Sequence, residues 1–183
     1  TTRLVGSEMC IRDSMKSGND AAAVLALFAA DNMSDAVALM NKEAKSLGAT
    51  ESNFVNPHGL YNDNHYTTVY DLYLIFNEAI KYSKFVDTLS CMKYTGSFTR
   101  KTAYGDYSIG CSYTNSNGFL TGSYATPDGI KVYGGKAGYT EVARRSYVML
   151  AESNNGHKYI IITMRAESLS LIHISEPTRR VVI

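Results

Sequence analysis

One lysine, Lys136, stands among glycines in the stretch VYGGKAGYT, residues 132–140. Because Gly134, Gly135 and Gly138 carry no side chains, another backbone can come close to this stretch. An extended peptide could pair with its main chain, and the lysine ammonium would hold a carboxylate and bias nearby proton equilibria. Taken alone, the pattern fits a glycine-rich turn with a solvated lysine better than it fits a peptide-binding strand.

A second polar group, Ser17-Gly18-Asn19, stands far upstream of Lys136, at the start of a predicted helix. A serine hydroxyl both donates and accepts, so it can pass a proton between a nucleophile and a leaving group. The asparagine amide can orient a substrate carbonyl. Serine and asparagine are also ordinary capping residues, and Ser153-Asn154-Asn155 has the same pattern in a predicted turn. The triplet therefore counts only in combination with other motifs.

Helices are predicted in the first half of the chain. The segments with helical composition or periodicity are residues 19–30, 34–47, 69–80 and 84–89. Ser34 is the expected cap of the second helix and Gly48 its stop. Thr68 with Asp71 resembles a capping pair for the third.

Strands are predicted in the second half. Residues 91–122 are rich in Tyr, Thr, Ser and Gly without a helical period, which predicts short strands and turns. Two strand-like runs, Arg145–Glu152 and Lys158–Ala166, flank Asn155-Gly156, a strong hairpin signal. Helices first and antiparallel strands last predict an α+β domain with helices packed on a sheet. Lys136 would end or begin a strand just before the last hairpin.

Composition excludes several function classes. The chain has 183 residues, which suits one domain with a real core, and its net charge of +1 gives no footprint for nucleic acid. Cys10, Cys91 and Cys111 show no metal-type spacing, and without a Cys/His cluster no metal site is predicted. A Cys91–Cys111 disulfide stays open, although two unrelated thiols are favoured.

The two ends of the chain do not match the rest, since neither has a periodicity that continues into its neighbour. Codons can be chosen for Leu4–Ser14 whose reverse complement encodes Leu169–Thr178 followed by arginine. The two segments therefore read as the two strands of one DNA piece, resembling a transposon-end adapter of sequencing libraries. We expect residues 1–14 and 169–183 to be adapter-derived and residues 15–168 to be a partial domain.

Several motifs in order resemble one family. SGNDAA opens a helix, FVNPHGL and HYTTVYDL follow, and GGKAGYT precedes the closing hairpin. Across nearly all of residues 15–168 this order resembles the serine D-alanyl-D-alanine carboxypeptidases, the low-molecular-weight penicillin-binding proteins related to serine β-lactamases. Their signatures are Ser-x-x-Lys, Ser-x-Asn and Lys-Thr-Gly. The resemblance implies the β-lactamase/penicillin-binding-protein-like transpeptidase fold, here truncated at its N-terminus.

The resemblance also implies roles for residues. Ser17 and Asn19 match the second signature, and Lys136 and Gly138 match the third. It implies that Ser17, Asn19 and Lys136 are catalytic, with Ser17 shuttling protons. Lys136, Gly138 and Thr140 would bind substrate, the lysine holding its terminal carboxylate.

The implied reaction removes the terminal D-Ala of a peptidoglycan stem peptide through an acyl-serine intermediate. It takes place outside the cytoplasmic membrane and needs no cofactor. The implied ligands are the stem peptide and β-lactam antibiotics, and attachment of the parent protein to a membrane through another segment stays open. Two alternatives stay open. One is a catalytically dead module that binds peptidoglycan peptides. The other is a β-lactamase-like hydrolase, which the SGN triplet and the FVNPHGL loop disfavour because they resemble the carboxypeptidases.

The chain departs from the family pattern at the third and first signatures. Ala137 stands where threonine or serine is usual, which removes a hydroxyl that could bind a carboxylate. The nucleophilic Ser-x-x-Lys should lie upstream of Ser17, where the adapter-like sequence stands. A literal match, Ser90-Cys91-Met92-Lys93, falls in the wrong order and is read as coincidence. We therefore expect this chain to be inactive, because covalent catalysis needs an activated nucleophile.

Other polar residues have weaker assignments. Relatives often carry an arginine near the last hairpin turn, where this chain has Lys158, with Arg144 and Arg145 as alternatives. His58 is expected to order its loop rather than to act on a ligand. His65 and His157 are predicted to be surface residues.

Overall fold

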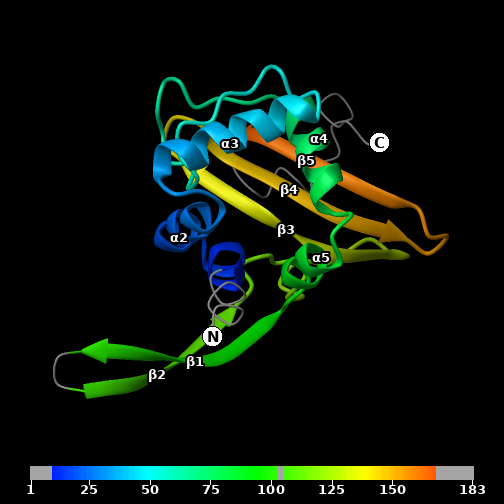
Figure 1. Cartoon of the computed structure of the whole chain (residues 1–183). Coiled ribbons are helices and arrows are strands. Elements are labelled where there is room, and N and C mark those ends of the chain that lie inside the picture. Colours follow the sequence, from blue (N-terminus) through cyan, green and yellow to red (C-terminus); the bar gives the residue numbers. More distant parts are fainter. Residues whose placement is uncertain (1–9, 103–104, 168–183) are drawn as a thin grey trace.

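The computed structural model describes residues 10–102 and 105–167. A helical segment at residues 10–16 is followed by the helices α2 (Asn19–Ala29), α3 (Met33–Ser46), α4 (Val69–Ala79) and α5 (Ser83–Leu89). The strands are β1 (Lys93–Thr102), β2 (Gly105–Thr114), β3 (Ile130–Thr140), β4 (Arg144–Ser153) and β5 (Lys158–Ala166). Helices come first and antiparallel strands last (Figure 1), so the predicted α+β class is confirmed.

The sheet that carries Lys136 has three antiparallel strands in the order β3-β4-β5. Lys136 pairs with Val148 and lies inside β3, so its predicted place at a strand end is wrong. The sequence around Lys136 does not indicate that β3 continues through this residue, because its glycines have low strand propensity. The last hairpin is confirmed, and Gly156 supplies the left-handed residue of its turn with φ 81°.

The core joins the helices to one face of this sheet. Its buried members are Phe76, Leu89, Leu150, Ile160 and Ile162. The rings of Phe76 and Phe85 meet edge to face at 5.8 Å, which packs α4 against α5. This contact and the core beneath it fix the helical layer over β4 and β5.

The capping predictions concern the starts of α3 and α4. Asp71 N donates to Thr68 Oγ1 at 3.1 Å, so the predicted cap of α4 is confirmed. The predicted cap of α3 is wrong by two residues, since Asn32 Oδ1, and not Ser34, accepts from Asp35 N. Asn32 wins because its amide also donates to the Asp35 carboxylate at 2.7 Å. Gly48, with φ 87°, follows the helix end as expected.

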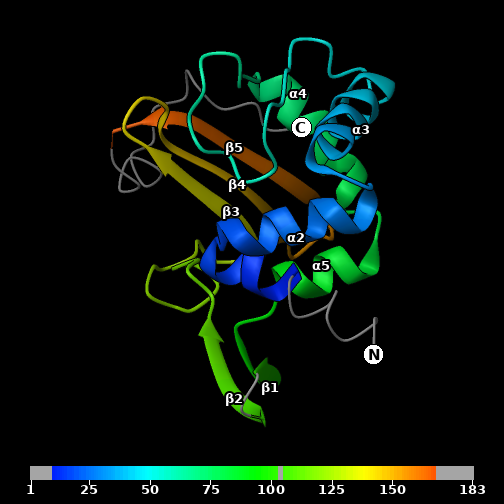
Figure 2. The same cartoon turned by 60° about the vertical axis from the view of Figure 1, so that its left-hand side comes forward.

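Residues 91–122 differ from the prediction of short strands. β1 and β2 each have ten residues and form one long hairpin that projects away from the three-stranded sheet in both Figure 1 and Figure 2. Tyr94 and Tyr113 stack across it with their ring centroids 6.4 Å apart. Cys91 precedes β1 while Cys111 pairs with Gly96 inside the hairpin, so both thiols are free, as the sequence favoured.

Most residues of the expected adapter segments, 1–14 and 169–183, lie outside the described residues. Of these, residues 10–14 are described, and they belong to the helix at 10–16. Arg12 forms an ion pair with Asp20 of α2 at 2.7 Å, and Met15 is fully buried. The adapter origin of residues 1–14 stays a prediction.

Candidate active site

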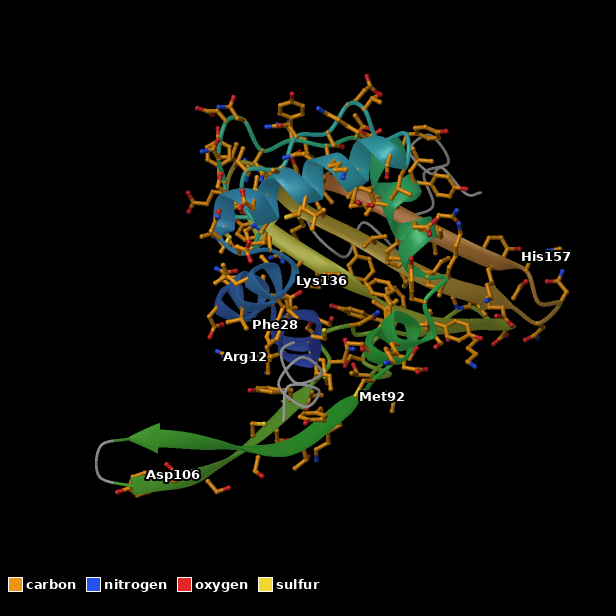
Figure 3. All side chains as sticks on the ribbon, viewed as in Figure 1. Arg12, Phe28, Met92, Asp106, Lys136 and His157 are labelled. Carbon is orange, nitrogen blue, oxygen red and sulfur yellow. The ribbon has the colours of Figure 1, made fainter. Side chains whose placement is uncertain are left out.

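Ser17 and Lys136 meet although 119 positions separate them in the sequence. Lys136 Nζ donates to Ser17 Oγ at 2.5 Å and to the carbonyl oxygen of Ala137 at 2.5 Å. Figure 3 shows Lys136 facing the first helices from β3. The N-cap of α2 is Gly18, which makes no side-chain capping bond, so Ser17 does not serve as the cap of this helix. Ser17 instead holds a left-handed backbone conformation, φ 53°, next to the lysine.

A cavity of about 420 Å³ surrounds this contact. Its described lining comes from the helical segment 10–16, the start of α2, the loop before α4, α4 itself, β3 and β4: Asp13, Ser17, Asn19, Pro57, His58, Gly59, Leu72, Lys136, Ala137, Gly138, Ser146, Tyr147 and Val148. The structure therefore brings Ser17, Asn19, Lys136 and Gly138 together. Thr140 lies at the end of β3, where its hydroxyl accepts from Ala143 N at 3.0 Å.

The three glycines around Lys136 have different neighbours. A Cβ on Gly134 would lie 2.2 Å from the carbonyl oxygen of Leu89, and one on Gly135 would lie 2.2 Å from that of Val148. The backbone that approaches these two positions is therefore the protein's own, and not a bound peptide's. Apart from its chain neighbours, no atom of the described residues lies within 4 Å of a Cβ on Gly138, and this glycine lines the cavity. Gly138 is the position of the three that is open to a ligand.

Burial sets the electrostatics of Lys136. Its desolvation lowers the pKa of the ammonium, while the Asp13 carboxylate opposes this and raises it. Burial also raises the pKa of Asp13, against the effect of Lys136. An ammonium that has lost part of its hydration gains more from a carboxylate than a fully solvated one does. This site is therefore suited to an anionic group.

We expect NMR titration of the Lys136 side chain to give a pKa below 10.5, the ordinary lysine value. The folded chain then binds this proton less tightly than the unfolded chain, so this group's contribution to stability rises with pH between the two pKa values. Asp13→Asn should lower the pKa further, because it removes the nearby negative charge. A Lys136 pKa at or above 10.5, or no response to Asp13→Asn, would contradict this electrostatic description.

The loop before α4 supplies a wall of the cavity that sequence reasoning did not assign to the site. Asp71, 2% exposed, accepts from Ser52 Oγ at 2.6 Å and from Glu51 N at 2.9 Å, which ties the loop's start to α4. His58 lines the cavity, and its Nδ1 accepts from Leu60 N at 3.3 Å. Because Nδ1 accepts, the neutral ring carries its proton on Nε2. The FVNPHGL segment, in which His58 directly follows Pro57, was the sequence feature that could have pointed to this loop as part of the site.

The other two histidines differ from each other. The prediction that His65 is a surface residue is wrong: its ring is half-buried, packs edge to face on Phe54, and accepts from Val55 N at 3.2 Å. Burial lowers the pKa of His65, and His58 adds to the effect. His157 is exposed, as predicted, at the tip of the β4–β5 hairpin (Figure 3).

Two further motifs lie away from the cavity lining. Ser90 ends α5, where its hydroxyl donates to the Val86 carbonyl at 2.7 Å, which agrees with reading the Ser90–Lys93 match as coincidence. Lys158 lies opposite Glu152 in the register of β4 and β5, beside the turn that joins these strands. Arg145 is next to the lining residue Ser146 and stacks over the Tyr139 ring at 5.1 Å. Arg144, Arg145 and Lys158 are all absent from the described lining of the cavity, so the role of a basic residue here stays a prediction.

The sequence profile of the D-alanyl-D-alanine carboxypeptidase family, Peptidase S11, matches residues 2–168. The chain belongs to this family. It is 32% identical over 160 residues to the D-alanyl-D-alanine carboxypeptidase DacF of Bacillus subtilis, a match that covers 83% of this chain and 36% of the relative. It is also 32% identical over 139 residues to DacA of Escherichia coli, covering 70% of this chain and 30% of that protein.

Solved structures of D-alanyl-D-alanine carboxypeptidases and related enzymes share the fold. A Streptomyces DD-transpeptidase superposes with a TM-score of 0.75 and 26% identity, over 88% of this chain and 61% of its own. A D-alanyl-D-alanine carboxypeptidase of Mycobacterium tuberculosis gives a TM-score of 0.66 and 25% identity, over 96% of this chain and 66% of its own. The chain spans about a third of the length of the curated carboxypeptidases it matches. Among the described residues no cluster of His, Cys, Asp and Glu could hold a metal ion.

Proposed function

We propose that the cavity around Lys136 binds the C-terminal D-Ala-D-Ala end of a peptidoglycan stem peptide, as the site of a serine D-alanyl-D-alanine carboxypeptidase. The observation that carries this proposal is the hydrogen bond from Lys136 Nζ to Ser17 Oγ, which joins two family signatures at one cavity. In this assignment Ser17, Asn19 and Lys136 are catalytic. Lys136, Gly138 and Thr140 bind the substrate, and the Thr140 hydroxyl also accepts from Ala143 N in the β3–β4 turn.

Each group has chemistry that suits its role. The Lys136 ammonium pairs with the terminal carboxylate of the peptide. The Ser17 hydroxyl accepts from Lys136 and still has a proton to donate, so it can carry a proton to a leaving amine. Because β3 is an edge strand among the described strands, its outer side can pair with an extended peptide beside Gly138. The same groups would hold the carboxylate of a β-lactam antibiotic.

We expect no covalent band when this chain is incubated with a fluorescent penicillin and run on a denaturing gel. The described serines that line the cavity are Ser17 and Ser146, and the Ser17 hydroxyl accepts a hydrogen bond from the Lys136 ammonium group. Acylation needs a serine activated by a base. A band that disappears in Ser90→Ala would identify Ser90 as a nucleophile and overturn this expectation.

A second candidate is a module that binds peptidoglycan peptides without cleaving them. Ala137 favours it, because a methyl group stands where the family signature has a hydroxyl. The genomic sequence upstream of the Met15 codon discriminates the two. A Ser-x-x-Lys encoded there supports the enzyme, and an intact reading frame without one supports the binding module. The same sequence tests the adapter origin of residues 1–14.

We further propose that the whole protein acts outside the cytoplasmic membrane, where peptidoglycan stem peptides are cleaved. No described helix is, by itself, long and apolar enough to cross a membrane, and α2 and α3 pass this test only as a pair bent by 81°. Association of the parent protein with a membrane through another segment is part of this proposal. Fractionation of cells that express the full-length protein tests both statements.

A further inference from the structure

The loop between β2 and β3 holds a buried amide that the proposed function does not use. Asn117 is 3% exposed. Its Oδ1 accepts from the backbone N–H of Phe119 at 3.0 Å and of Leu120 at 3.3 Å, which shapes the loop. Its Nδ2 is buried and has no hydrogen-bond partner within the described part of the chain. Buried donors in native proteins nearly always have an acceptor, so this amide calls for a partner such as an ordered water or a ligand group.

A small cavity of about 60 Å³ lies beside this amide. Asn117 lines it together with Phe119, Tyr124, Ala137 and Tyr147. Ala137 and Tyr147, which pair directly across β3 and β4, also line the large cavity, so the two cavities share a wall. The volume suits a few waters, or a group as small as a carbonyl with its neighbouring atoms.

The strand geometry links the two cavities to one peptide. Lys136 and Ala137 are consecutive in β3, so their side chains point to opposite faces of the sheet. The side chains of an extended peptide paired with an edge strand also alternate between the two faces, whereas its carbonyl oxygens lie in the plane of the sheet. A peptide whose terminal carboxylate lies at Lys136 would therefore present its preceding portion toward Ala137 and the small cavity.

We propose that the small cavity is a second subsite for the bound peptide, in which Asn117 Nδ2 donates a hydrogen bond to a peptide oxygen that precedes the terminal carboxylate. This inference rests on the proposed function, because it needs a peptide on the free edge of β3. The ring walls and the small volume limit this subsite to small groups. Asn117 is then a specificity-determining residue in addition to shaping its loop.

The test is NMR of the ¹⁵N-labelled chain titrated with a synthetic tripeptide that ends in D-Ala-D-Ala. The Asn117 side-chain NH₂ should shift downfield on binding, while that of Asn115, which already donates to the Cys91 carbonyl at 3.0 Å, should stay in place. Asn117→Asp keeps the acceptor for the loop and removes the donor. It should weaken peptide binding by about three- to tenfold. Ser123→Ala, on the exposed part of the same loop, is the matched control and should not change affinity.

The outcomes separate this inference from the proposed function. Peptide binding that depends on Lys136 but leaves the Asn117 NH₂ unmoved, with Asn117→Asp as tight as the wild type, overturns the subsite alone. A water that stays in contact with this NH₂ in the presence of peptide overturns it too. If the wild-type chain binds no peptide at all, the proposed function fails and the subsite with it. The wild-type spectra decide the matter even if Asn117→Asp does not fold.

Discussion

Lys136→Ala is expected to weaken binding of a peptide that ends in D-Ala-D-Ala by about 10- to 100-fold. The substitution removes the half-buried ammonium that faces the cavity, and a hydrogen bond to a charged partner contributes about 1.5–3 kcal/mol. It also removes the donor that holds Ser17 Oγ. Isothermal titration calorimetry at neutral pH measures the loss, with circular dichroism to verify the fold.

Lys131→Ala is the matched control for this prediction. Lys131 belongs to the same strand, is exposed, and places its Nζ 4.5 Å from the centre of the Tyr133 ring. Its removal takes the same charge from the molecule without touching the cavity, so affinity should stay unchanged. An equal loss in both variants would show that Lys136 acts only through the overall charge.

Gly134→Ala is expected to destabilise the fold by about 3 kcal/mol or more. Gly134 has φ 135°, a conformation that residues with side chains rarely adopt, and its added Cβ would lie 2.2 Å from the carbonyl oxygen of Leu89. Relief requires that β3 move away from the end of α5, which opens the core at Leu89. Urea denaturation followed by circular dichroism measures the free energy of unfolding.

Gly138→Ala should behave in the opposite way. Its Cβ meets no atom within 4 Å, so we expect a stability change within about 0.5 kcal/mol. The methyl group would enter the cavity and weaken peptide binding, because Gly138 is a lining residue. The assignment of Gly134 to structure and Gly138 to binding fails if the stability losses come in the reverse order.

The sequence predicted most of the helical layer, since short local signals fix its ends. Thr68 with Asp71 marked the start of α4, and Asn155-Gly156 marked the last hairpin, because capping and turn geometry depend on residues a few positions apart. For residues 91–122 the sequence predicted strands but not their length, although a period of two is present: Tyr94, Cys111 and Tyr113 share one face and Thr95 and Ser112 lie on the other. The glycines and serines of this segment concealed the length of the strands.

The sequence motifs predicted the central residues of the candidate site, but they did not predict which other residues line its cavity. Ser17 and Lys136 could be paired only through a family resemblance, because no local pattern relates residues 119 positions apart. The loop at His58 and the carboxylate of Asp13 entered the cavity through tertiary packing, which composition and periodicity do not encode. The glycines at 134 and 135 were explained by a ligand, whereas the close backbone belongs to α5 and β4.

The most direct test compares the tripeptide acid with its C-terminal amide by calorimetry, on the wild-type chain and on Lys136→Ala. If Lys136 holds the terminal carboxylate, the amide should bind the wild-type chain at least about tenfold more weakly than the acid. This difference should vanish in Lys136→Ala. Equal binding of acid and amide to the wild-type chain, or a preference for the acid that survives the substitution, would contradict the carboxylate site proposed at Ser17 and Lys136.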